Sequence, residues 1–300
     1  DRRGGTNGDV LVVHPTDSVL NSRYLFQILT DENFFEYNIQ HSKGAKMPRG
    51  SKPHILQYLV PIPCPDDPEK SLAIQGEIVR ILDKFTELTA ELTAELTQRK
   101  KQYNHYREQL LTAGNDKSVV TTVGNILDMR AGKHIKAAQI EDSQSEDHPY
   151  PCFGGNGLRG FVADFSHSGK HVLIGRQGAL CGNVKRTDGE YYATEHAVVC
   201  IPAVSVDIDW VFHKLTFMNL NQYKSKSAQP GLAVGKIAEL PITLPPLEEQ
   251  KRIASILDSF DTLTTSLTEG LPREIELREK QYAFYRDQLL SFPKPDAEAA

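Results

Sequence analysis

The sequence predicts an α+β protein in which globular α/β domains alternate with two long helices that pair as an antiparallel coiled coil. The main observation is an internal repeat: Ile-Leu-Asp at 81–83 recurs at 256–258, and Lys-Gln-Tyr at 101–103 recurs at 280–282. Each copy carries apolar residues at spacings of three and four, which is typical of a helix with a coiled-coil seam. A chain of 300 residues also leaves room for two globular parts.

The repeat divides the chain into five predicted segments. In chain order these are the C-terminal part of a first globular domain (1–65), the first long helix (66–113), a second globular domain (114–247), the second long helix (248–291) and a disordered tail (292–300). The first globular segment matches only the back half of the second, roughly 194–247. We therefore expect a chain that is truncated at its amino end and lacks the front half of its first domain.

Corresponding elements are predicted in the two globular segments. Hydrophobic patterning predicts strands at 10–13 and 197–201 and helices at 23–29 and 209–218. Proline-rich sequences at 60–65 and 240–246 precede the long helices, where proline ends a strand and admits a helix start. The predicted seams include Leu88, Leu92 and Leu96 in the first long helix, and Leu263, Leu267 and Leu271 in the second.

Composition excludes several classes of protein. Four cysteines lie far apart with no Cys-x-x-Cys pair, which indicates neither a disulfide framework nor a zinc site. No apolar run approaches the roughly 18 residues of a membrane span, and no signal-like segment opens the chain. We expect a soluble cytoplasmic protein that does not associate with a membrane.

The distribution of charge favours an anionic partner, although the net charge is −5. Three windows contain no Asp or Glu but several Lys or Arg residues: 37–65, 165–187 and 210–238. A local cluster of basic residues is the electrostatic footprint of a nucleic-acid-binding surface, whatever the total charge.

Three motifs lie at or within the long helices. Leu-Pro-Pro-Leu-Glu-Glu-Gln at 244–250 leads into Ile253, and its counterpart is Ile-Pro-Cys-Pro at 62–65 followed by Ile74 and Gln75. Two Thr-Ala-Glu-Leu units occupy 89–96, and Gly-Leu-Pro-Arg-Glu-Ile-Glu-Leu-Arg occupies 270–278. Over nearly its whole length the chain resembles the specificity subunits of type I restriction-modification enzymes, and the last two motifs resemble the IC branch in particular.

The resemblance implies a partner, a role and an architecture. In this family each target-recognition domain reads one half of a split double-stranded DNA target, and the long helices fix the gap between the halves. The helices also recruit two methyltransferase (M) subunits, and restriction/translocase (R) subunits can join. The chain is thus expected to be a non-catalytic DNA-binding subunit without a cofactor of its own, while S-adenosylmethionine, ATP and Mg²⁺ are expected on partner subunits.

Motifs for catalysis are not found in the sequence. The glycine-rich sequence at 153–157 does not clearly follow a strand and open a helix, so a surface turn is the better interpretation. Ten histidines show no metal-ligand spacing. Two alternative functions remain open: the specificity region of a single-chain restriction-methylation enzyme, and a coiled-coil adaptor whose globular parts bind protein.

Base reading needs Arg, Lys, Asn or Gln side chains on loops that a rigid domain holds in place. Three glycine-flanked or basic stretches of the second domain qualify: 155–159, where glycines would permit close approach to DNA, 175–178 and 224–231. The candidate DNA-binding residues are Asn156, Arg159, Arg176, Gln177, Lys224, Lys226 and Gln229, with Lys46 and Arg49 from the first domain. Lys185 and Arg186 are interpreted as phosphate contacts or plain surface.

The Thr-Ala-Glu-Leu units predict a spacer between the two DNA half-sites. Their leucines repeat every four residues, so one unit more or less returns a leucine to nearly the same seam. Each unit adds about 40° of net rotation on ordinary helix geometry, which matches the roughly 35° twist of one base pair. One added unit is therefore expected to lengthen the gap by one base pair.

Overall fold

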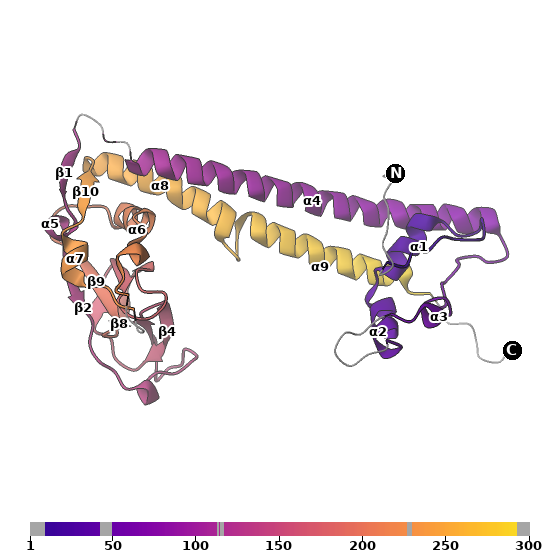
Figure 1. Ribbon diagram of the computed structural model, residues 1–300, viewed down its shortest axis with the longest axis horizontal. Coiled ribbons are helices and arrows are strands. Elements are labelled where there is room, and N and C mark those ends of the chain that lie inside the picture. Colours follow the sequence, from indigo (N-terminus) through magenta and orange to yellow (C-terminus); the bar gives the residue numbers. More distant parts are fainter. Residues whose placement is uncertain (1–9, 43–49, 113, 115–116, 227–229, 293–300) are drawn as a thin grey trace. The chain divides into compact units, whose positions relative to one another are not determined.

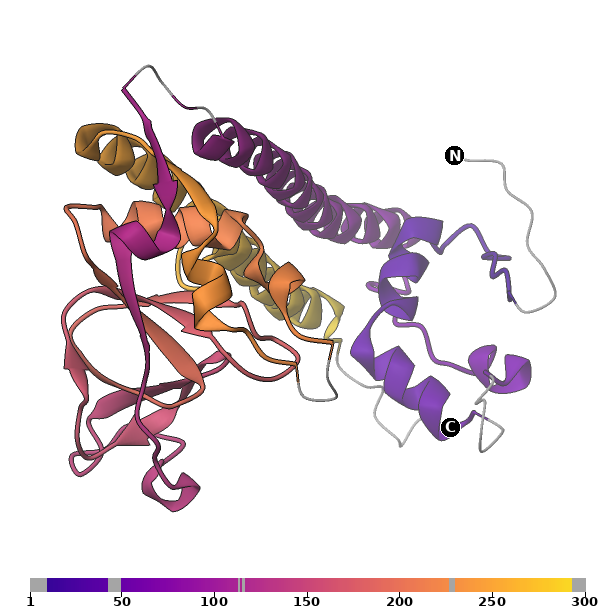
Figure 2. The same cartoon turned by 60° about the vertical axis from the view of Figure 1, so that its left-hand side comes forward.

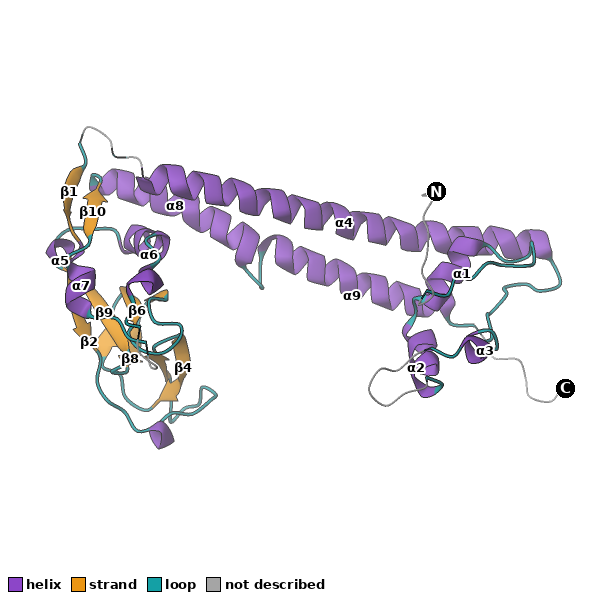
Figure 3. Cartoon of the chain, in the orientation of Figure 1, coloured by secondary structure: helices purple, strands orange, loops and turns teal. Residues whose placement is uncertain are grey.

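The computed structural model describes residues 10–42, 50–112, 114, 117–226 and 230–292. The chain forms two compact units (Figure 1): unit 1 comprises Asp1–Thr97 and Ser266–Ala300, and unit 2 comprises Gln98–Thr265. Within the described residues all strands belong to unit 2, as Figure 3 shows. The predicted fold class, mixed helices and sheets with long helices, is confirmed.

Unit 1 consists of helices in the part of the chain that is described. They are α1 (Ser22–Leu29), α2 (Glu32–Gln40), α3 (Lys52–Ile55), the first part of α4 (Pro68–Thr112) and α9 (Gly270–Leu290). The side chains of Asn21 and Asp31 cap α1 and α2 by accepting hydrogen bonds from backbone N–H groups. Tyr24 and Ile28 of α1 bury their side chains against Leu82 of α4, so the helix predicted at 23–29 is confirmed and forms the core of this unit.

Unit 2 contains three sheets, seen from a second side in Figure 2. The small sheet pairs β1 (Val119–Thr122) with β10 (Pro241–Leu244). The second has the order β2 (Leu127–Ala131), β9 (Ala197–Pro202), β6 (His171–Gly175) and β7 (Val184–Thr187), all antiparallel. The third has the order β4 (Gly157–Val162), β3 (Tyr150–Gly154), β8 (Glu190–Ala193) and β5 (His167–Ser168), with β3 and β8 parallel. The strand predicted at 197–201 is β9.

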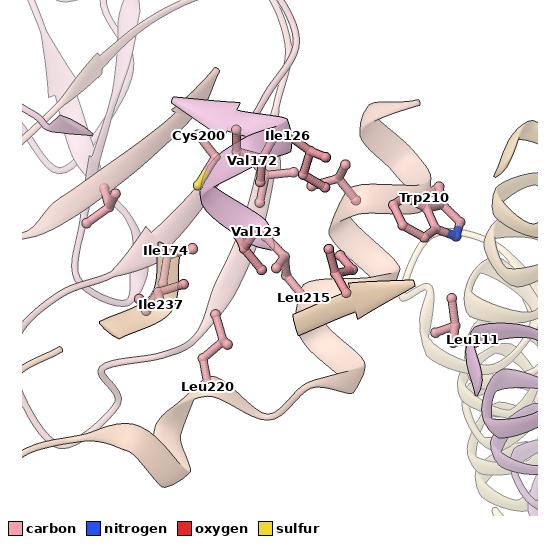
Figure 4. Packing of buried hydrophobic residues seen from close by; sticks show 14 of the residues in the cluster. Leu111, Val123, Ile126, Val172, Ile174, Cys200, Trp210, Leu215, Leu220 and Ile237 are labelled. Carbon is pink, nitrogen blue, oxygen red and sulfur yellow. The ribbon is translucent and has the colours of Figure 1, made fainter. Parts of the chain in front are cut away.

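Helices cover the second sheet and complete the main core of unit 2. They are α5 (Val123–Ile126), α6 (Ile208–Phe217), η2 (Leu220–Tyr223), α7 (Val234–Ala238) and α8 (Leu247–Thr265). The short η1 (Ala137–Gln139) has no buried residue and takes no part in this core. Figure 4 shows Trp210 and Leu215 of α6 in one cluster with Val172 and Cys200 of the sheet and Leu111 of α4. The helix predicted at 209–218 is therefore α6, and it links the sheet to the long helices of this unit.

The long helices run antiparallel within each unit. In unit 1, Ile78 of α4 shares a cluster with Leu289 of α9, and the Phe85 ring stacks on Tyr285 at 5.5 Å between centroids. In unit 2, Tyr106 of α4 stacks on Phe260 of α8 at 5.7 Å. Such aromatic pairs add to the free energy gained by burying the seam.

The second long helix is interrupted, so the prediction of one helix over 248–291 was wrong. The helix α8 ends at Thr265 and α9 begins at Gly270. Gly270 has φ of 77°, a left-handed conformation that glycine adopts without a steric penalty. Leu267 was assigned to the seam but is 78% exposed. Pro272 fits this break because proline is compatible with the first turn of a helix.

Two strands expected in residues 1–65 do not form. Residues 10–13 have no strand conformation, and Val10 and Val12 are exposed. The proline-rich segment at 60–65 is also not a strand, whereas its counterpart in unit 2 includes β10. The difference has a physical cause: β10 pairs with β1, and the described part of unit 1 offers no such partner strand. No helix among the described residues is both long and apolar enough to cross a membrane.

Candidate nucleic-acid interface

A groove in unit 2 brings together segments that are far apart in the sequence. Its volume is about 820 Å³. The turn between β3 and β4 supplies Asn156, and β4 itself supplies Arg159. The segment after β6 supplies Arg176 and Gln177. The loop after η2 supplies Ser225. Four residues proposed from sequence therefore line one surface, although their contact with DNA stays a prediction.

Two glycines allow these loops to approach one another. A Cβ atom on Gly175 would overlap the carbonyl oxygen of Gly155, and a Cβ on Gly155 would lie 2.8 Å from the carbonyl oxygen of Gln177. Real Cβ atoms essentially never come so close to backbone. The sequence interpretation assigned the glycine at 155 to close approach of DNA; in the structure its first requirement is packing of one loop on another.

The backbone of residues 176–178, which line the groove, is hydrogen-bonded to two neighbouring segments. The Arg176 N–H donates to the His196 carbonyl at 2.8 Å, and the Arg176 carbonyl accepts from the Leu232 N–H at 2.8 Å. The Gly178 N–H donates to the Pro230 carbonyl at 3.0 Å. Because these backbone groups are already paired, the segment is fixed in place and its side chains remain to contact a ligand.

The groove carries positive charge without acidic neighbours among its lining residues. Within the described chain neither Arg159 nor Arg176 forms an ion pair, whereas Arg130 binds Asp128 and Arg252 binds Glu249. An arginine presents five N–H donors in a planar fork and no acceptor. Two unpaired guanidinium groups on one surface therefore favour binding of an anionic or acceptor-rich ligand.

The remaining candidates are distributed differently. Lys224 is exposed beside the groove and its Nζ donates to Asn221 Oδ1 at 3.0 Å, while Lys226 is exposed on the same loop. Gln229, Lys46 and Arg49 lie outside the described residues, and their role stays a prediction.

The interpretation of Arg186 as a phosphate contact or plain surface was wrong. Its Nη1 lies 2.8 Å from Asp209 Oδ1 and 2.7 Å from Asp258 Oδ1, and its guanidinium carbon lies 4.8 Å above the Phe212 ring centroid. The side chain thus joins β7 to α6 and α8. No local pattern around Arg186 indicates this role, because the two carboxylates are distant along the chain.

The described residues contain no group of three or more His, Cys, Asp or Glu side chains that could hold a metal ion. The glycine-rich sequence at 153–157 forms the end of β3 and the turn into β4, so it does not open a helix as a dinucleotide fingerprint would. The chemistry that this surface offers is binding through hydrogen-bond donors and positive charge.

Sequence comparison places this groove within a known domain. The family described as "Type I restriction modification DNA specificity domain" matches residues 115–277, more than half of the chain. The chain belongs to this family. The match covers all the described candidate residues of the groove.

Curated members of the family are similar to the chain over most of its length. It is 63% identical over 219 residues to the Type I restriction enzyme EcoprrI specificity subunit of Escherichia coli, covering 71% of this chain and 55% of that protein. It is 40% identical over 264 residues to the EcoR124I/EcoR124II specificity subunit of Escherichia coli, covering 80% and 65%. The chain thus spans less than two thirds of the length of either relative. A putative specificity subunit of Haemophilus influenzae is 34% identical, covering 95% and 76%.

Solved structures of the family have the same fold. The type I system S subunit from M. genitalium aligns with a TM-score of 0.61 at 16% identity, covering 93% of this chain and 75% of that one. The HsdS subunit from Thermoanaerobacter tengcongensis aligns with a TM-score of 0.58 at 16% identity, covering 89% and 68%.

The sequence reasoning missed one residue that lines the groove and one that contacts a lining residue from outside it. His196 lines the groove at the turn between β8 and β9. Asn183 precedes β7, and its Nδ2 donates to Asn156 Oδ1 at 2.6 Å. A single histidine or asparagine in a turn carries no spacing signal, so only the assembled loops show that these residues belong to the site.

Proposed function

We propose that this chain is the sequence-specific DNA-binding specificity subunit of a type I restriction-modification complex, and that the groove of unit 2 reads one half of a bipartite target. The observation that carries the proposal is the convergence of Arg159 and Arg176, neither of which forms an ion pair with another described residue, with Asn156 and Gln177. Membership of a family described by DNA specificity supports it.

The chemistry of this groove suits base edges as well as phosphates. Specific readers are typically Arg, Lys, Asn and Gln side chains that a rigid scaffold presents to a DNA groove, while phosphate contacts mainly position the protein. Arg176 and Gln177 follow a buried strand and lie on a backbone segment bonded on both sides. Lys224 and Lys226 are exposed on a neighbouring loop and suit phosphate contacts.

We also propose partners for the rest of the chain. Two methyltransferase (M) subunits, and restriction/translocase (R) subunits in the complete enzyme, would assemble on it. S-adenosylmethionine, ATP and Mg²⁺ would bind to those subunits, and this chain would be non-catalytic and act in the cytoplasm, where cellular DNA is available. The long helices would set the gap between half-sites through their Thr-Ala-Glu-Leu units.

The binding proposal is tested by substitution in the groove. Duplexes selected from a randomised library serve as cognate DNA, and a scrambled duplex serves as the reference. Arg176→Ala is expected to weaken cognate binding by about 1–3 kcal/mol with little effect on scrambled DNA, because a lost base contact affects only the sequence that offers it. Gln229→Ala is expected to behave in the same way.

Arg130→Ala provides the matched control, because Arg130 is an exposed arginine of the same unit that is already paired with Asp128 and lies outside the groove. Equal losses on both DNAs for Arg176→Ala would demote Arg176 to a phosphate contact. Equal effects of Arg176→Ala and Arg130→Ala would remove the groove from the interface.

The two alternatives make different predictions for the purified chain. A protein-binding adaptor would not retain duplex DNA, whereas a DNA-binding subunit would do so with an affinity that falls steeply with salt. A single-chain restriction-methylation enzyme would have its catalytic domains in the same reading frame. Transfer of a labelled methyl group by the partner-free chain would contradict the non-catalytic role.

A further inference from the structure

The side chains in the groove of unit 2 are unequally divided between hydrogen-bond donors and acceptors. Arg159 and Arg176 carry donors only, and none of the lining residues is acidic. Asn156 would ordinarily present both a carbonyl oxygen and an NH₂ group. Its Oδ1 accepts a hydrogen bond from Asn183 Nδ2 at 2.6 Å, which leaves both N–H donors of the amide but only one lone pair of the oxygen for a ligand.

This imbalance selects among the bases. In the major groove guanine presents two acceptors, N7 and O6, which match the paired donors of an arginine. Adenine presents one acceptor and one donor, and cytosine presents a donor. Two arginines and a donor-oriented amide therefore match a surface that contains guanine better than one formed by A·T pairs alone, while Gln177, which offers a donor and an acceptor, can match adenine beside it.

We infer that the half-site read by unit 2 contains guanine at two or more positions, on either strand, and that Arg159, Arg176 and the NH₂ group of Asn156 contact base acceptors there. Asn183 is the positioning residue that orients the Asn156 amide. This inference rests on the proposed function, because it names the chemistry of the DNA that the same groove binds.

The placement of Arg176 supports a base contact. Its backbone N–H and carbonyl are bonded to His196 and Leu232, both at 2.8 Å, and its side chain is partly buried. A guanidinium group whose backbone is held in place loses less conformational entropy on binding than one on a free loop. Such preorganisation favours the directional contacts of base reading over contact with phosphate.

The first experiment separates the inference from the proposal beneath it. The full chain selects duplexes from a randomised library, and the enriched half-site is expected to contain at least two G·C pairs. No enriched sequence would contradict the proposed function itself. An enriched half-site with fewer than two G·C pairs would leave the proposed function standing and overturn the inference.

The second experiment removes single acceptors from the selected DNA. Replacing a contacted guanine by 7-deazaguanine deletes N7 but keeps the base pair, and is expected to weaken binding by roughly tenfold. The same replacement is expected to cost the Arg159→Ala or Arg176→Ala variant almost nothing at the guanine that the missing arginine contacted, as in a double-mutant cycle. If the affinity losses from 7-deazaguanine and from the arginine variant were fully additive at every guanine, these arginines would contact phosphate and not the bases.

The third experiment tests the role of Asn183 through preference rather than affinity. In Asn183→Asp the carboxylate can only accept, so the Asn156 NH₂ group must turn towards it and the Asn156 carbonyl oxygen then faces the DNA. The preferred base at one position is expected to change from one that offers an acceptor to adenine or cytosine, whose amino groups donate. Asn183→Ala removes the orienting bond without adding charge, and is expected to relax preference at that position alone. An unchanged preference in both variants would overturn the positioning role.

Discussion

Two helices in different units, α1 in unit 1 and α6 in unit 2, pack on their long-helix partners through corresponding contacts. In unit 1, Gln75 of α4 accepts from the Asn21 N–H at 2.8 Å, and Gln27 of α1 donates to Asp83 of α4 at 3.1 Å. In unit 2 the corresponding positions of α6 and α8 make contacts of the same kind. Gln250 of α8 accepts from the Asp207 N–H at 2.9 Å, and His213 of α6 is paired with Asp258 of α8 at 2.9 Å.

The two copies differ in the arginine that forms an ion pair with the corresponding aspartate. Asp258 is bound by Arg186 from β7, which also covers the Phe212 ring. Asp83 is bound by Arg23 from α1 itself, and Phe26, which corresponds to Phe212, is 58% exposed. The helix pair is therefore a scaffold common to both units, and the ion pair beside it differs according to whether a sheet packs on that scaffold.

The largest effect is expected from the two buried glutamines that the copies share. Gln75 and Gln250 are 0% and 1% exposed, and each also donates through Nε2 to a backbone carbonyl, at 2.8 and 2.7 Å. A leucine of similar size would remove the partner of a partly buried N–H and of a partly or fully buried carbonyl, each costing about 1–3 kcal/mol. Gln250→Leu and Gln75→Leu should therefore each lower the free energy of unfolding by about 2–4 kcal/mol.

Different probes follow the two units. Trp210 is the single tryptophan of the chain and is buried in unit 2, so its fluorescence during urea unfolding reports on that unit. Hydrogen exchange of peptides from α1 reports on unit 1. Gln75→Leu should shift the unfolding transition seen by Trp210 less than Gln250→Leu does. Equal shifts would mean that the two units unfold together and are not separate scaffolds.

A smaller and unequal effect is expected from the two arginines. The Arg186 side chain is 32% exposed and contacts two carboxylates, so Arg186→Ala should cost about 2 kcal/mol in unit 2. The loss comes from removing a guanidinium shared by two partly buried carboxylates, although Asp209 keeps Lys170 and Asp258 keeps His213 as partners. The Arg23 side chain is 67% exposed and contacts one carboxylate, and Arg23→Ala should cost less than about 1 kcal/mol in unit 1. Arg186→Lys is the control, since it keeps the charge but not the fork and should give an intermediate loss. Equal losses for the two alanine variants would contradict the distinction drawn between the copies.

The local elements and several groove residues could be predicted from sequence, whereas their assembly could not. The periodicity that identified α1, α6 and the long helices is a local property of the chain. Glycine-flanked polar residues identified Arg176 and Asn156 for a similar reason. Their convergence depends on sheet topology, because β3 and β6 belong to different sheets. The sequence of neither loop indicates the strand order of these sheets.

The errors have equally specific causes. The break before α9 was overlooked because a leucine at 267 fits a heptad, although the Gly-Leu-Pro sequence that starts at Gly270 already favoured a helix start. A strand at residues 10–13 was expected from apolar composition, but a strand needs a partner, which the described part of unit 1 does not supply. Arg186 was assigned to the surface because a charged pair in sequence gives no information on carboxylates that lie on α6 and α8.

The smallest expected effect is on the pH dependence of stability. It arises because His213 of unit 2 occupies the position that Gln27 occupies in unit 1. His213 is 2% exposed, and burial lowers its pKa from the usual value. The hydrogen bond to Asp258 and the negative charges of Asp258 and Asp261 partly oppose this lowering of the pKa, whereas the positive charge of Arg186 adds to it. The unfolded state therefore binds a proton as pH falls through about 6.5, before the folded state does. The contribution of His213 to stability is present above that pH and is lost as pH falls below it, with a slope of at most about 1.4 kcal/mol per pH unit for one proton.

His213→Gln gives unit 2 the residue of unit 1 and keeps an amide that can donate to Asp258. Unfolding midpoints from Trp210 fluorescence, measured between about pH 5 and 8, should fall more steeply with acid in the natural chain than in this variant. His167 and His171 also have pKa values lowered by burial and titrate with the same sign, but they remain in both proteins. The difference between the two curves therefore isolates His213. Parallel curves would mean that the histidine accepts its proton in the folded state, and that the exchange between the copies has no consequence for stability at low pH.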